Sequence, residues 1–265
     1  MPATMPELEA FLVGRFMVFT LVLARTGALI MTAPLFGSQA LPRRVRGLLA
    51  VAMSLLVTPV YLSASLPPVT ETVEYGRLLV NEVLIGLLLG LGINILFAGV
   101  QVSGQIASQM SGLSLADVFN PAFEEDISVF SQLFYFLTLA VFVAIGGHRL
   151  VTEALLETFA WAPPGHAALG DSFVDVLVSI LSQSFALGIR AAAPILVALL
   201  LSNFVLGLIS RTLPQINVIA VGFGLNSLLG LGVLCLSIGA VAWTFQGPTV
   251  DVMQQVQEVV QSVSR

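Results

Sequence analysis

Six long apolar segments run along the chain, separated by polar or proline-containing stretches. They are Phe11 to Ala33, Leu48 to Leu66, Leu78 to Gln109, Ile127 to Ile145, Val176 to Ser210 and Val218 to Phe245. About 20 consecutive apolar residues suffice for an α-helix to cross the hydrocarbon core of a bilayer. The pattern therefore predicts an all-α, polytopic membrane protein with about six long helices.

The third and fifth segments are longer than a bilayer requires. At 1.5 Å per residue, Leu78 to Gln109 would form a helix of about 48 Å, and Val176 to Ser210 one of about 52 Å. We expect these helices either to be broken or to project beyond the bilayer. Pro194, near the middle of the second of them, predicts a kink there. Polar residues in the later half of the third segment should face protein or a pore: Asn94, Gln101, Ser103, Gln105, Ser108 and Gln109.

Composition excludes the common soluble classes. Of the 265 residues, 57% are hydrophobic and 9% are charged, whereas a soluble domain carries roughly 25% charged residues. Ten basic residues against 15 acidic ones give no basic patch, so nucleic acid is not an expected partner. His148 and Glu153 have the wrong spacing for a zinc motif. We predict no catalytic residues, no metal and no cofactor, and hence no enzyme.

Ionisable residues inside the apolar segments are candidates for buried pairs that fix an assembly. We assign this role to Arg25, Glu82 and Arg190, and to Arg211 at the end of the fifth segment. A proton or ion pathway is the alternative, but it would need acidic groups in series. Gly86 and Gly90 form a GxxxG pair that predicts close helix packing.

The connector between the third and fourth segments is unusually apolar. Its candidate functional residues are Gln109, Met110, Gly112, Leu113, Leu115, Val118, Phe119, Asn120 and Pro121. An apolar loop at membrane depth must be buried in protein or line a cavity. A short amphipathic extension of the third helix is the alternative interpretation.

The C-terminal stretch predicts an amphipathic helix. Val252, Val256, Val259 and Val263 recur at helical spacing, opposite glutamine and glutamate side chains. Because the stretch has little positive charge to bind anionic lipid, we expect it to pack on a partner or to fray.

Several motifs in this order resemble the FliR/SctT family of type III secretion export-gate proteins. They are Ala33-Pro34, Leu41-Pro42-Arg43-Arg44-Val45-Arg46, Glu82-x-x-x-Gly86-x-x-x-Gly90, Gln109-Met110 leading to Pro121, Gly147-His148, Ala193-Pro194, Asn203 to Gly207, and Arg211-x-x-Pro214-Gln215-x-Asn217. Two positions depart from the family pattern. Asn120 stands where an Asp often precedes the loop proline, and Gly224 stands where a proline is frequent.

The resemblance implies a non-enzymatic subunit of a hetero-oligomeric helical gate for unfolded protein, in the inner membrane part of a flagellar or virulence basal body. FliP-like and FliQ-like subunits and other export-apparatus membrane proteins would be its partners. Residues 1–165 would form a FliP-like portion with a pore plug at 109–121, residues 166–248 a FliQ-like hairpin, and residues 249–265 the amphipathic tail. A small-solute transporter or channel working alone is the alternative; it should show an inverted repeat, and none is clear.

Overall fold

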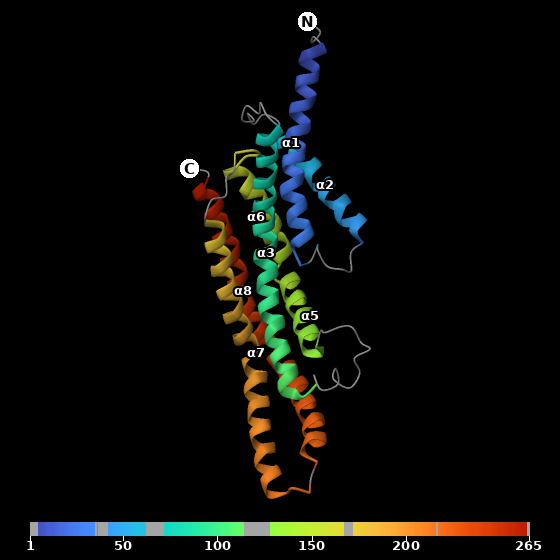
Figure 1. The fold of residues 1–265 in the computed structure, drawn as a ribbon, viewed down its shortest axis with the longest axis vertical. Coiled ribbons are helices and arrows are strands. Elements are labelled where there is room, and N and C mark those ends of the chain that lie inside the picture. Colours follow the sequence, from blue (N-terminus) through green and yellow to red (C-terminus); the bar gives the residue numbers. More distant parts are fainter. Residues whose placement is uncertain are drawn as a thin grey trace. The chain divides into compact units, whose positions relative to one another are not determined.

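The computed structural model describes residues 5–34, 36, 42–61, 72–113, 128–166, 172–215 and 217–263. All regular secondary structure in these residues is helical (Figure 1). The helices are α1 (Met5–Thr32), α2 (Arg43–Tyr61), α3 (Thr72–Ser111), α5 (Val129–Ala144), α6 (Gly147–Trp161), α7 (Ser172–Thr212) and α8 (Val218–Val263). The predicted all-α class is confirmed.

Five of the six predicted apolar segments correspond to helices that could cross a membrane, and the fourth, Ile127 to Ile145, corresponds to α5, which could not do so alone. Five of the described helices are long and apolar enough, namely α1, α2, α3, α7 and α8. The shorter α5 and α6 pass the same test only when taken together as one broken span. Ser128 caps the start of α5 by accepting a hydrogen bond from the Ser131 backbone N–H. Gly146, with φ +76°, follows the end of that helix, and such a backbone angle costs little only for glycine.

The three longest helices run without interruption. α3 has 40 residues and α7 has 41, continuing through Pro194, so each is about 60 Å long. α8 has 46 residues and continues through Pro248 into the C-terminal stretch. The alternative that the over-long segments form broken helices is therefore wrong. Projection beyond a bilayer stays a prediction.

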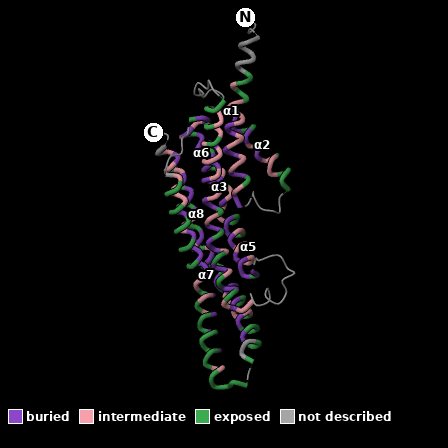
Figure 2. Tube along the Cα trace, viewed as in Figure 1, coloured by how far each residue is buried: buried purple, intermediate pink, exposed green. Residues whose placement is uncertain are grey.

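The chain divides into two compact units, and each unit is built from separate stretches of the sequence. Unit 1 comprises Met1–Asn94, Gly147–Ile180 and Val250–Arg265, and unit 2 comprises Ile95–Gly146 and Leu181–Thr249. The continuous helices α3, α7 and α8 thus each contribute to both units. α3 is the most enclosed of the long helices: 61% of its most apolar stretch is buried, against 28% in α7 and in α8 (Figure 2).

The C-terminal stretch packs within unit 1. Val252, Val256 and Val260 are buried, and Gly92 of α3 lies so close to Val252 that an added Cβ would stand 3.1 Å from its Cγ1. Val260 belongs to a buried cluster with Ile85 and Ala162. The predicted helix is confirmed, but its apolar face covers this chain's own α3 rather than a partner, because α8 continues directly into it.

An aromatic cluster forms the centre of unit 2. The ring of Phe97 on α3 makes edge-to-face contacts with Tyr135, Phe142 and Phe245, at centroid distances of 5.6–5.8 Å. Edge-to-face packing of this kind adds to the stabilisation that burial of the rings provides. The cluster connects α3, α5 and α8 inside this unit.

Candidate functional site

A buried ion pair in unit 1 joins two of the predicted charged residues. Arg25 Nε donates to Glu82 Oε2 over 2.6 Å, and both side chains are almost completely removed from solvent. The remaining guanidinium nitrogens donate to Thr158 Oγ1 at 3.3 Å and to the Ala162 carbonyl oxygen at 3.0 Å. The second carboxylate oxygen of Glu82 accepts from the Gly165 backbone N–H at 2.8 Å.

These contacts satisfy both charges in a place that is removed from bulk solvent. The guanidinium carbon of Arg25 also lies 4.2 Å from the centroid of the Phe159 ring, a favourable cation–π distance. Buried charges are tolerated only when geometry and further hydrogen bonds offset their desolvation. The pair therefore acts as a charged lock that holds α1, α3 and α6 together with the turn after α6.

The other two predicted charges lie on the surface of the chain. Arg190 and Arg211 are both exposed on α7, so the burial expected for them is not found within this chain. Helix geometry accounts for the difference, since Arg190 shares a face of α7 with Ala186, Pro194 and Val197, which are all exposed. Their proposed role in assembly remains a prediction.

Glycines in α3 permit close approach of other helices in each unit. In unit 1, a Cβ at Gly86 would overlap the Arg25 carbonyl oxygen, and one at Gly90 would overlap the Thr32 hydroxyl. In unit 2, a Cβ at Gly99 would overlap the Ser184 carbonyl oxygen. The structure therefore places the GxxxG pair at a close crossing of α1 and α3, as its spacing predicts.

The predicted plug begins at the end of α3 in unit 2. α3 ends at Ser111, and Gly112 adopts φ +82°. The alternative interpretation, in which the third helix extends into the connector, therefore holds only as far as Ser111. Leu113 is the last described residue of the predicted site. Leu115, Val118, Phe119, Asn120 and Pro121 lie outside the described residues.

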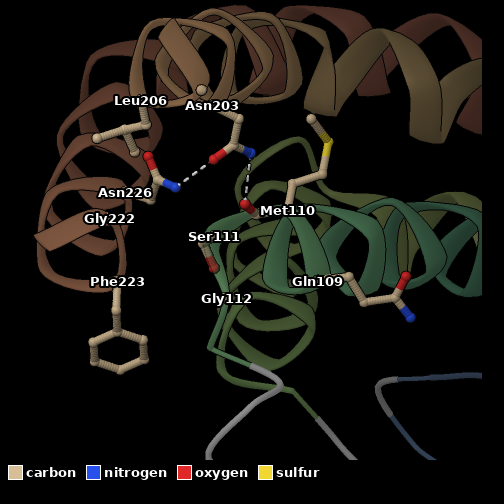
Figure 3. A pocket seen from close by; sticks show the side chains of 10 residues that line it. Gln109, Met110, Ser111, Gly112, Asn203, Leu206, Gly222, Phe223 and Asn226 are labelled. Atoms are coloured by element: carbon tan, nitrogen blue, oxygen red, sulfur yellow. Dashed lines mark hydrogen bonds between the residues drawn. The ribbon is translucent and has the colours of Figure 1, made fainter. Parts of the chain in front are cut away.

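A cavity of about 340 Å³ adjoins this end of α3 (Figure 3). It is lined by residues of α3, α7 and α8 and by Gly112: Gln109, Met110, Ser111, Gly112, Asn203, Leu206, Gly207, Gly222, Phe223 and Asn226. Its polar groups are carboxamides, hydroxyls and backbone atoms, with no ionisable side chain among the lining residues. Such a lining offers neutral hydrogen bonds and no acid–base chemistry.

A chain of hydrogen bonds among the lining residues of this cavity runs from α8 to α3. Asn226 Nδ2 donates to Asn203 Oδ1 at 2.7 Å, and Asn203 Nδ2 donates to the Met110 carbonyl oxygen at 2.9 Å (Figure 3). Ser202 Oγ donates to Asn226 Oδ1 at 2.6 Å. Sequence reasoning noted Asn203 only within a family motif and did not single out Asn226. The sequence feature that could have indicated this contact is the presence of one carboxamide in each of two apolar helices.

The polar face of α3 is divided between burial and exposure. Ser103 and Ser108 are buried, Gln101 and Gln105 are half-buried, and Gln109 is exposed. Asn94, in unit 1, is exposed as well. In the described part of the chain, no group of three His, Cys, Asp or Glu side chains could hold a metal ion.

Comparison with known proteins identifies the family. The model for "Bacterial export proteins, family 1" matches residues 16–250. The chain belongs to this family. Its relatives include three proteins named flagellar biosynthetic protein FliR. The one from Caulobacter vibrioides is 32% identical, covering 86% of this chain and 91% of the relative. That of Aquifex aeolicus is 29% identical, covering 92% and 95%, and that of Escherichia coli is 31% identical, covering 83% and 84%.

Membership of the bacterial export protein family agrees with the predicted resemblance. The matched range includes both the Arg25–Glu82 lock of unit 1 and the carboxamide chain of unit 2. The long apolar helices place the family member in a membrane. The names of the relatives connect it with flagellar biosynthesis.

Proposed function

We propose that this chain is a core, non-enzymatic subunit of a flagellar-type protein export gate in the bacterial inner membrane, within the basal body. The family match over residues 16–250 carries the proposal, and the names of relatives that align with most of the chain support it. Its cargo is unfolded protein, and other subunits supply the energy for transport.

FliP-like and FliQ-like subunits are the proposed partners. The exposed large apolar side chains of α7 and α8 within unit 2 support this assignment, and they include Leu200, Leu201, Phe204, Leu228, Leu236 and Trp243. The half-buried Gln101 and Gln105 on α3 also favour a protein or pore neighbour, because lipid cannot satisfy a carboxamide.

Residues 109–121 are the proposed closure segment of the pore. Apolar side chains such as Met110, Leu113 and Phe119 exclude water and ions from a narrow opening by dewetting. Methionine adapts to an irregular opening because its side chain is unbranched and flexible. The abrupt end of α3 at Ser111 supports this proposal, since the segment then leaves the helix direction at Gly112.

Co-expression with the FliP-like and FliQ-like partners tests the assembly. We expect the chain to migrate in one large complex on a native gel, and to aggregate or be degraded when it is produced alone. A heat-stable, monodisperse monomer extracted without partners would contradict the proposal. The stand-alone transporter would then be the better hypothesis.

Deletion of Ser111 to Phe119 tests closure separately from assembly. We expect the deletion complex to form in normal amount and to admit small ions or a dye that the intact complex excludes. The intact complex in the same vesicles is the control. An assembled deletion complex that leaks no more than the intact one would show that the segment does not close the pore.

A further inference from the structure

The end of α3 is held by a side chain from another helix. The last four carbonyl groups of an α-helix have no partner within the helix. Here the Met110 carbonyl oxygen, in the last turn, accepts from Asn203 Nδ2 of α7 at 2.9 Å. Asn203 therefore caps α3 from a position 93 residues away in the sequence.

The carboxamide of Asn203 is oriented by a buried neighbour. Asn203 itself is exposed, whereas Asn226 is 4% exposed and donates to Asn203 Oδ1. Ser202 donates to the oxygen of Asn226, so this oxygen does not compete for the N–H groups of Asn203. The three side chains thus fix which end of the Asn203 carboxamide faces Met110.

Asparagine is well suited to this position because it both donates and accepts. An aspartate would accept from Asn226 but would place a carboxylate against the Met110 carbonyl oxygen, with no hydrogen to share. The adjoining cavity of about 340 Å³ leaves space beside Met110 and Gly112. The end of α3 therefore has room to move when this neutral hydrogen bond breaks.

We propose that Asn203 is a latch that couples the α7–α8 pair to the end of α3, with Asn226 as its positioning residue. This inference rests on the proposed closure role of the segment that begins at Gln109. With the latch formed, the last turn of α3 is fixed at Ser111, from which the proposed closure segment continues. Breaking the Asn203–Met110 bond frees the last turn and permits opening.

Hydrogen–deuterium exchange in the assembled complex tests the latch directly. The variant is Asn203→Asp, and Asn217→Asp is its matched control. Asn217 lies near the start of α8, where its Oδ1 accepts from the Ala220 backbone N–H at 3.2 Å, a bond that a carboxylate retains. We expect backbone amides 109–113 to exchange about five-fold faster in Asn203→Asp, the size of one lost hydrogen bond, and at the normal rate in Asn217→Asp.

Two results would overturn the latch. One is unchanged exchange at 109–113 in Asn203→Asp, and the other is an equal increase in Asn217→Asp, which would indicate a general effect of charge. Asn226→Ala provides a second variant: it should accelerate the same amides, because it leaves Asn203 unoriented. Normal exchange in that variant would remove Asn226 from the proposal.

A leakage assay separates the latch from the proposed closure role. We expect Asn203→Asp complexes to leak several-fold more than intact or Asn217→Asp complexes, and less than the deletion of Ser111 to Phe119. If the deletion leaks and Asn203→Asp does not, the coupling is wrong while closure stands. If the deletion does not leak, the closure role fails, and the exchange result alone decides whether Asn203 holds the end of α3.

Discussion

Unit 1 and unit 2 each contain a polar network that contacts α3, and the two networks differ in charge and in exposure. Arg25 and Glu82 in unit 1 form a charged pair with both side chains buried. In unit 2, Asn226 is buried, but Asn203 is exposed beside a cavity, and every group in its chain of hydrogen bonds is neutral. The same helix is thus fixed by two different kinds of interaction.

The difference matters because the two interactions break at very different cost. Removing one partner of a buried ion pair costs about 3–5 kcal/mol, since the other charge is left without compensation. A neutral hydrogen bond contributes about 1 kcal/mol net, which thermal motion or a modest load can overcome. We therefore interpret the unit 1 network as a permanent lock and the unit 2 network as a reversible contact.

The largest expected effect comes from removing the arginine of the lock. Arg25→Leu should destabilise unit 1 by about 3–5 kcal/mol and prevent recovery of the assembled complex. Protease resistance of the extracted complex at increasing temperature measures the loss. Arg149→Leu is the control, because the Arg149–Glu153 pair is 3.5 Å apart on the surface and exposed pairs contribute at most about 1 kcal/mol.

A second substitution shows whether the loss comes from the unpaired carboxylate. Arg25→Leu combined with Glu82→Leu leaves no buried charge, so most of the stability should return. If the double variant is as unstable as the single one, packing rather than charge explains the effect, and the contrast between lock and reversible contact is lost.

The two units differ in their polar networks, but both should depend on the close approach of another helix to a glycine of α3. Gly86→Ala in unit 1 and Gly99→Ala in unit 2 each place a methyl group against a backbone carbonyl oxygen, of Arg25 and of Ser184 respectively. Overpacking of this kind costs about 1–3 kcal/mol. Thermal aggregation of the complex should show a similar loss for both variants.

Gly76 on the same helix provides the matched control. A Cβ there would meet no atom within 4 Å, so Gly76→Ala should be neutral or slightly stabilising, because alanine favours a helix more than glycine does. If only Gly86→Ala lowers the thermal stability of the complex, α3 has room to shift in unit 2. That result would sharpen the difference between the units.

The sequence predicted the helices well and the polar contacts unevenly. The length of the apolar segments alone located the long helices. A segment in lipid must satisfy its backbone hydrogen bonds internally, whatever its neighbours are, and a helix does this. Arg25 and Glu82 were recognisable because an ionisable residue in an apolar helix needs a partner. The contacts of Glu82 with Gly165 and of Arg25 with Ala162 could not be predicted, since they depend on where the turn after α6 lies.

Neutral side chains gave a weaker signal than charged ones. Asn203 and Asn226 are carboxamides in apolar helices, but a neutral group costs less to bury than a charge, so the sequence alone did not single them out as a pair. The outward position of Arg190 was missed for a related reason. Periodicity shows which residues share a helix face, but it does not show which face the chain's own helices cover.

Arg190 should give the smallest effect on the chain itself and a measurable effect on assembly. It lies within an apolar helix like Arg25, yet it is exposed, and it has no ion pair among the residues that the structure describes. Arg190→Leu removes an arginine that costs about 2.5–3.5 kcal/mol on insertion scales, so membrane insertion should be unchanged or improved. If a partner subunit supplies a carboxylate or carbonyl group, recovery of the co-expressed complex should fall several-fold. Arg190→Lys keeps the charge and should restore most of the recovery of the complex. Normal assembly and export in Arg190→Leu would show that this arginine does not contribute to the gate.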